Sequence, residues 1–169
     1  MFENQNLIFR NARPDEYDRV ALLLKEAYQQ YAEGMPPEIF NAYLEDIMDV
    51  RGRIPQSELI VADLDGHLAG TVTLYLHPAE SPVWPEGWAS VRLLGVSPLY
   101  RKQGIGQALM EECIRRCKKE GIKTLGLHTT EAMATAKRMY ERMGFIRVPE
   151  FDFHPRPGVV VMAYRLDIV

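Results

Sequence analysis

Apolar residues in the first fifty positions recur at steps of three and four, the spacing of a helix with one buried face. The pattern covers 17–31 and then 38–50, and the segment 34–37, Gly-Met-Pro-Pro, separates the two runs. Pro14 and two acidic residues precede the first run and suit the first turn of a helix. The sequence therefore predicts two amphipathic helices that follow a short strand at 7–10.

From position 58 the pattern changes to short apolar runs that are typical of strands. The runs 59–64 and 70–76 are joined by Asp65-Gly66, a dipeptide that tolerates the positive φ of a tight turn, so they predict a hairpin. A proline-rich loop is expected at 77–87, with Trp84 and Trp88 covering the edge of the core. Further strands are expected at 88–96, 124–127, 145–148 and 159–166, and further helices from Gly104 to Gly121 and over 131–143.

The composition is that of a globular protein and adds few constraints. With 169 residues, 47% hydrophobic and 25% charged, we expect a single α/β (α+β) domain over 1–169. A net charge of −3 argues against nucleic-acid binding through bulk charge. The longest apolar runs are far shorter than the ~20 residues of a membrane span, and the first residues lack a basic leader, so we expect a cytoplasmic protein with no membrane association.

The two cysteines, Cys113 and Cys117, lie four residues apart in a helical pattern. Neither has a neighbouring cysteine or histidine at the spacing of a metal site. They are expected to be buried thiols, and we expect no metal.

The segment 93–106, LLGVSPLYRKQGIG, carries the clearest chemistry in the chain. A strand leads through a basic turn into two glycines that open a helix, where unpaired N–H groups and the helix dipole favour phosphate. The glycines allow close approach of the backbone, and Arg101 and Lys102 add positive charge. The spacing is neither that of a P-loop nor that of a dinucleotide fingerprint. The segment is a candidate pyrophosphate cradle; a plain strand-to-helix turn with solvated basic side chains is the alternative.

These residues resemble the acyl-CoA signature of the GNAT superfamily of N-acetyltransferases, Arg/Gln-x-x-Gly-x-Gly/Ala after a strand. Arg101, Gly104 and Gly106 fill that pattern. A second block, 136–145, resembles another family motif in which an alanine and a tyrosine precede a Gly-Phe pair. The order of elements resembles the family over essentially the whole chain.

The resemblance implies a mixed, mostly antiparallel central sheet of six to seven strands flanked by about four helices. The sheet would splay between the strands ending near Val96 and His128, and acetyl-CoA would lie in the gap. By resemblance, the backbone of the first strand would bind the pantetheine arm, the turn and helix start the pyrophosphate, and the second block the thioester end. The residues that would contact the cofactor are Leu94, Gly95, Val96, Arg101, Lys102, Gln103, Gly104, Ile105, Gly106, Gln107, Ala136 and Tyr140.

The implied reaction is direct acetyl transfer to a primary amine through a tetrahedral intermediate. The backbone N–H of Val96 would stabilise the oxyanion, and the Tyr140 hydroxyl would act as general acid toward the CoA thiolate. The chain departs from the family where many members carry a glutamate on the central strand, here Ser90 and Arg92, and an asparagine, here Met133. The general base is therefore open; the candidates are Glu131, His128, Asp152, His154 or a water molecule.

The acceptor is expected to be the amine of a small molecule, and the charge distribution indicates that it could be cationic. The segment 26–50 holds six acids and no Lys or Arg, which would suit a cationic amine, although exposed acids on a solvated helix are ordinary. The segment 92–123 carries a net +5, so the rest of the chain carries −8. A protein lysine or N-terminal amine is the alternative acceptor, and a non-catalytic acyl-CoA-binding regulatory module is the alternative of another class. Nucleic acid fits poorly as a partner, and a monomer or homodimer is expected.

Overall fold

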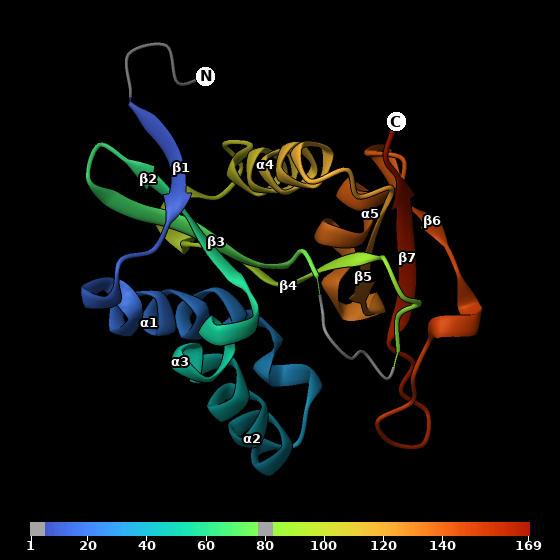
Figure 1. The fold of residues 1–169 in the computed structure, drawn as a ribbon. Coiled ribbons are helices and arrows are strands. Elements are labelled where there is room, and N and C mark those ends of the chain that lie inside the picture. The colour runs from blue at the N-terminus through green and yellow to red at the C-terminus, as the bar shows by residue number, and fades with distance from the viewer. Residues whose placement is uncertain (1–5, 78–82) are drawn as a thin grey trace.

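The computed structural model describes residues 6–77 and 83–169, which form a seven-stranded mixed sheet (Figure 1). Residues 1–5 and 78–82, which include part of the expected 77–87 loop, lie outside the described residues. The strand order is β1-β2-β3-β4-β5-β7-β6. The strands are β1 (Leu7–Asn11), β2 (Glu58–Leu64), β3 (His67–Tyr75), β4 (Ala89–Val96), β5 (Thr124–Thr129), β6 (Ile146–Arg147) and β7 (Met162–Asp167). All neighbours pair antiparallel except β4 and β5, as the resemblance implied.

Helices cover both faces of the sheet (Figure 1). On one face lie α1 (Tyr17–Tyr28), α2 (Pro37–Met48) and the single turn α3 (Val50–Arg53). On the other lie α4 (Ile105–Lys119) and α5 (Ala134–Arg142). Two apolar clusters result, one between the sheet and α1–α3 and a larger one between the sheet and α4–α5. The sheet is thus the middle layer of three.

The strands β4 and β5 pair near their N-terminal ends and then diverge. Their parallel pairing consists of Ala89 with Leu125 and Ser90 with Gly126, whereas β4 pairs with β3 along nearly its whole length. From Val91 onward, the side of β4 that faces β5 is open. The expected splay between these two strands is confirmed.

β4 also carries a bulge next to the opening. Its register against β3 shifts between the pairs Thr71–Gly95 and Thr73–Arg92, so β4 has one extra residue there. Leu93 within the bulge has φ of +57°, a left-handed conformation that a leucine seldom adopts. The bulge turns Leu93 toward α1 while its neighbour Leu94 packs against the larger cluster.

A buried carboxylate, Glu16 at the start of α1, belongs to a network that joins β1, β2 and α1. Glu16 is 1% exposed and accepts hydrogen bonds from both terminal nitrogens of Arg10, at 2.7 and 2.8 Å, and from the Arg13 N–H. Arg10 also contacts Asp63 on β2. The hydrogen bonds from Arg10 lower the pKa of Glu16 to about 2, so this network stabilises the fold above the ordinary carboxyl pKa and is lost in acid.

The sequence located every one of these strands and the four longer helices, with errors at their ends. The first helix ends at Tyr28 and continues as a 3-10 turn, Gln29–Gly34. The last strand begins at Met162 instead of 159 because its partner β5 ends opposite it at Thr129. The preceding Val161 instead forms an isolated bridge with Phe153. The two cysteines are buried free thiols on α4, as expected.

Candidate active site

The open edge of β4 presents backbone hydrogen-bonding groups. The Ser97 N–H donates to the Ala69 carbonyl of the neighbouring chain segment at 2.9 Å. Hydrogen-bonded pairs alternate along an antiparallel ladder, so Gly95 is the next residue bonded to β3 and Val96 turns its N–H and C=O the other way. The Val96 peptide group therefore faces the side from which β5 has departed.

A tyrosine from α1 reaches the same stretch of backbone. The Tyr28 hydroxyl donates to the Leu94 carbonyl at 3.0 Å, across the bulge. Its ring is 7% exposed and packs edge-on against Tyr31 and Tyr43. Gly95 allows this approach, because a Cβ there would lie 3.2 Å from Ala27 on α1. Tyr28 thus holds the bulged segment of β4 in place beside the open edge.

The N-terminus of α4 lies beside the open edge. Gly104 begins it with φ of +81°, which favours glycine, and the first intrahelical bond runs from Ala108 N to Gly104 O. The N–H groups of residues 105–107 therefore have no partner within the helix and can bind an anion. The pyrophosphate cradle at this turn stays a prediction.

Gly106 connects this helix start to the open edge. A Cβ at Gly106 would lie 3.6 Å from Val96 Cγ2, 3.9 Å from Leu94 Cδ2 and 3.8 Å from Met139 Sδ on α5. These are ordinary contact distances, so a glycine here is not required by packing. Its missing side chain instead leaves room between β4, α4 and α5.

Several residues of the motif have side chains with other roles. Ile105 is buried in the core at 1% exposure, so only its backbone can reach a ligand. The Arg101 Nη2 donates to Ala27 O at the end of α1, at 3.2 Å. Gln107 bonds Glu111 on the helix surface. Lys102 is exposed and, with φ of +63°, helps turn the chain into α4.

Tyr140 lies on α5, one turn after the half-buried Ala136, on the face toward the sheet. Its ring is 6% exposed and packs against Phe145, so both parts of the second motif meet. Burial raises the pKa of Tyr140 well above its ordinary value. The phenol therefore stays protonated at neutral pH and can donate a hydrogen bond or a proton.

The four side chains considered as a base differ sharply in their surroundings. Asp152 binds Arg147 through both oxygens, at 2.6 and 2.8 Å, and the Arg147 hydrogen bonds lower the pKa of Asp152. Glu131 is exposed and lies 3.4 Å from Lys137, and His154 is exposed.

His128 alone lies on β5 beyond its last pair with β4. Burial lowers its pKa, so the imidazole is neutral at pH 7. One of its ring nitrogens contacts the Phe151 carbonyl at 2.9 Å.

An aromatic wall surrounds His128 on the face of α1 and α2. The Trp84 ring lies 4.5 Å from the His128 ring and within 3.1 Å of the Cβ position of Gly126, so it covers β5 as expected for the core edge. Trp88 and Phe151 pack against Trp84, and Phe153, which is 42% exposed, packs against His128.

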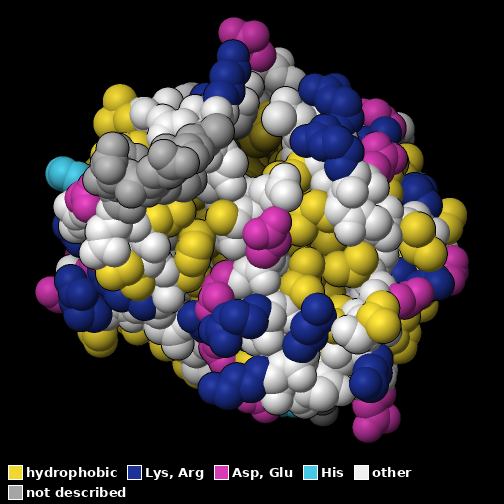
Figure 2. Space-filling model, turned by 90° about the horizontal axis from the view of Figure 1, so that it is seen from above, with side chains coloured by type: hydrophobic (Ala, Val, Ile, Leu, Met, Phe, Trp, Pro, Cys, Tyr) yellow, Lys and Arg dark blue, Asp and Glu magenta, His cyan; other side chains and the backbone are white. Residues whose placement is uncertain are grey.

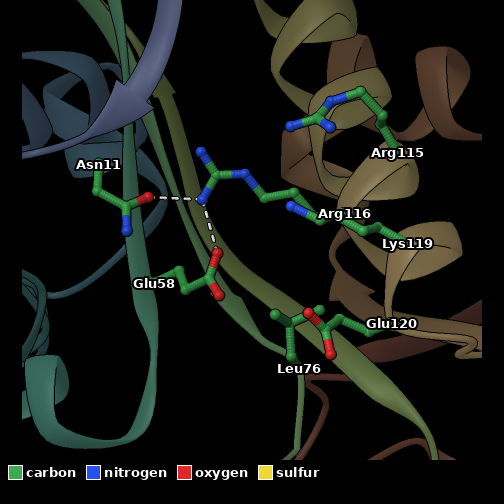
Figure 3. Close-up of a pocket in the computed structure, with 7 residues that line it drawn as sticks. All are labelled: Asn11, Glu58, Leu76, Arg115, Arg116, Lys119 and Glu120. Carbon is green, nitrogen blue, oxygen red and sulfur yellow. Dashed lines mark hydrogen bonds and ion pairs between the residues drawn. The ribbon is translucent and has the colours of Figure 1, made fainter.

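A cavity of about 300 Å³ lies at the other end of α4 (Figure 3). The Arg116 side chain crosses it to bond Glu58 at 2.6 Å and also bonds Asn11. Arg116 follows Gly104 by twelve residues, roughly 18 Å at the rise of an α-helix. The side chains that line the cavity form structural ion pairs, and the cavity is not part of the candidate active site.

The basic residues form no single continuous surface on the face seen from above in Figure 2. Lys and Arg side chains gather there in separate groups with acidic and apolar side chains between them. Within residues 6–77 and 83–169, no helix is long and apolar enough to cross a membrane, and no group of side chains could hold a metal ion.

The family model described as Acetyltransferase (GNAT) family matches residues 18–145, which include both motifs. The chain belongs to the GNAT acetyltransferase family. It is an acetyl-CoA-dependent N-acetyltransferase, and the expected resemblance is confirmed.

Three similar proteins give the breadth of this GNAT family relationship. An uncharacterized N-acetyltransferase of Schizosaccharomyces pombe is 26% identical over 90% of both chains. The ribosomal protein bS18-alanine N-acetyltransferase of Escherichia coli is 40% identical over 31% of this chain and 35% of its own. The PaiA N-acetyltransferase of Thermoplasma acidophilum, solved with coenzyme A, is 16% identical over 96% and 99% of the two chains, with a TM-score of 0.77.

The sequence did not predict that two further residues lie near this GNAT site. Tyr28 was expected only as part of a core-facing helix, and its hydrogen bond to Leu94 depends on how α1 crosses β4. Met139, whose sulfur lies near Gly106, was visible only as a residue inside the second motif.

Proposed function

We propose that this protein transfers the acetyl group of acetyl-CoA directly to a primary amine of a small molecule. The observation that carries the proposal is the open edge of β4, which runs beside the unpaired amides of α4 and the buried phenol of Tyr140. Solved neighbours contain CoA or acetyl-CoA, which supports the same cosubstrate here.

The residues present suit the chemical parts of that cosubstrate. The backbone N–H and C=O groups of Val96 match an amide of a pantetheine arm. The free amides of residues 105–107 match a pyrophosphate, with Lys102 close in sequence to add charge. Gly106 has no side chain between β4 and α5, where a Cβ would contact Val96, Leu94 and Met139.

The proposed chemistry needs an electrophile, an oxyanion donor and a proton for the leaving group. The cosubstrate supplies the thioester. The Val96 N–H is a fixed donor for negative charge that develops on the thioester oxygen, and Tyr140 donates to the departing sulfur. A neutral amine is required at the carbon, and His128 or a water molecule receives its proton.

A protein acceptor remains the second candidate, because one relative acts on an alanine of ribosomal protein bS18. Contact between the 3-10 turns Gln29–Gly34 and Glu131–Met133 favours the small molecule. This contact bridges α1 and α5 on either side of the opening, whereas a polypeptide acceptor needs an open groove.

The test measures turnover and CoA affinity, and it uses a substitution that would block the proposed cosubstrate site. Free CoA release is measured with a panel of amino acids, aryl amines, diamines and peptides, and CoA affinity is measured by calorimetry. Gly106→Val should weaken CoA binding about 100-fold, a cost of roughly 3 kcal/mol, because the added side chain would occupy the proposed cosubstrate site. Lys118→Val, which places the same side chain on the exposed side of α4, should leave affinity unchanged. Unchanged CoA affinity in Gly106→Val would remove the proposed cosubstrate site.

A further inference from the structure

Arg92 lies on β4 immediately before the bulge, on the face covered by α1 and α2. Its side chain is 50% exposed, and one of its terminal nitrogens lies 3.4 Å from Asp46, which is itself 61% exposed. Such a long ion pair between exposed groups contributes little stability and separates easily. The guanidinium is therefore available to a ligand at this position.

The surroundings of Arg92 place it beside the expected site of transfer. Ser90 pairs with Gly126, so Arg92 and His128 each lie two residues further along their diverging strands. After burial, which is the larger cause, the charge of Arg92 also lowers the pKa of His128. Arg92 precedes the backbone of Leu94 and Val96 by two and four residues.

Apart from Asp46, the groups named around Arg92 can donate hydrogen bonds. Burial raises the pKa of Tyr43 to about 12, so its phenol is protonated and can donate a hydrogen bond. Arg53 lies close enough for the two arginines to affect each other, and within residues 6–77 and 83–169 Asp46 is the acid that pairs with Arg92. A guanidinium beside a phenol is a donor set that suits a carboxylate.

Two of the six acids that suggested a cationic acceptor have other roles in this region. Asp49 caps α3 through the Gly52 N–H, and Asp46 faces Arg92. Glu26, Glu33, Glu38 and Glu45 are exposed.

We propose that the acceptor amine also carries a carboxylate, which Arg92 binds with help from Tyr43, and that the acceptor is an amino acid with a large apolar or aromatic side chain. This inference rests on the proposed function and names its substrate class. The aromatic wall next to His128, with Phe153 partly exposed, supplies the apolar surface for that side chain. A positive charge near the acceptor also favours the neutral form of its amine, which is the reactive form.

The test uses three probes that differ only at the carboxylate: L-phenylalanine, L-phenylalaninamide and phenethylamine. The wild-type protein should acetylate the amino acid with a kcat/KM about 30-fold above those of the other two, the value of a charged hydrogen bond of about 2 kcal/mol. Arg92→Gln should remove this preference, and Arg92→Lys should keep part of it. Arg51→Gln, which breaks the exposed ion pair with Asp18, is the matched control and should keep all of it.

A second measurement does not depend on turnover. With CoA present, calorimetry compares N-acetyl-L-phenylalanine with its amide, and Arg92→Gln should weaken the acid alone. If CoA binds but no amine releases it, the proposed function fails while this binding difference still decides the inference. Equal treatment of acid and amide by the wild-type protein, a preference for diamines, or an equal loss for all probes in Arg92→Gln would each overturn it.

Discussion

The two edges of β4 have opposite surroundings although they belong to one apolar strand. Toward β3, the edge is paired along nearly its whole length apart from the bulge, and α4 presses closely on the ladder at Gly70. Toward β5, two residue pairs are followed by an edge where Val96 has outward-facing backbone groups and where a Cβ at Gly106 would meet no atom closer than 3.6 Å. Packing complementarity holds the first edge together. The second edge keeps polar groups available for a ligand at the cost of lost pairing.

The largest effect is expected at the open edge, from Tyr140→Phe. Loss of the proton donor should lower kcat about 100-fold, the lower end of the range for general acid catalysis, while CoA affinity changes less than about twofold. The raised pKa of Tyr140 places its titration above the ordinary tyrosine range, so no loss of kcat from this group is expected up to about pH 10. Steady-state kinetics and calorimetry give the two quantities.

Tyr164→Phe is the control for that change. Tyr164 is also buried, but it lies on β7, away from β4, and its hydroxyl bonds Glu141 at 3.3 Å. Its variant should retain wild-type kcat. Wild-type turnover in Tyr140→Phe would exclude Tyr140 as the proton donor.

At the closed edge, Gly70→Ala should affect stability and not binding. The added Cβ would lie 3.0 Å from Leu109 Cδ1 and 3.1 Å from both Ile105 Cγ2 and the Gly95 carbonyl. Overpacking of this kind should lower the free energy of unfolding by about 2 kcal/mol, measured by urea denaturation. Gly106→Ala is the matched substitution at the open edge and should not destabilise the fold, because alanine is the better helix former. Equal stability of the two variants would show that the edges do not differ in packing.

The contrast between the edges also marks what the sequence could predict. Strands, helices and the hairpin at Asp65-Gly66 followed from periodicity and turn chemistry, and the boundary errors arose where pairing with a distant strand decides the end, as at Met162. Periodicity cannot distinguish a strand paired on both edges from one that loses a partner halfway, because both are apolar. The splay was predicted from the two motifs through resemblance.

The candidate site was predictable where backbone conformation requires particular residues, as at Gly104 with its positive φ. It was not predictable where a side chain reaches across from a distant element. Ile105 matched the motif but contributes its side chain to the core, whereas Tyr28 and Arg92 gained their positions from the crossing of α1 and α2 over β4.

The smallest effect is expected from Tyr28→Phe, at the bulge of β4 that lies between the paired and the open edge. The change removes the hydrogen bond to Leu94 O but keeps the ring contacts with Tyr31 and Tyr43. The loss should cost about 1 kcal/mol of stability. It should also lower kcat several-fold, since the bulge at Leu93 would hold the neighbouring backbone less firmly.

Tyr17→Phe, at the other end of α1, tests whether any lost tyrosine hydroxyl has this effect, and it should change neither quantity. A purely structural Tyr28 would lower stability and leave kcat unchanged, because the folded fraction would still position the oxyanion donor correctly. A reduced kcat with an unchanged KM for acetyl-CoA would instead assign Tyr28 to positioning the backbone that the open edge presents to the reacting carbonyl.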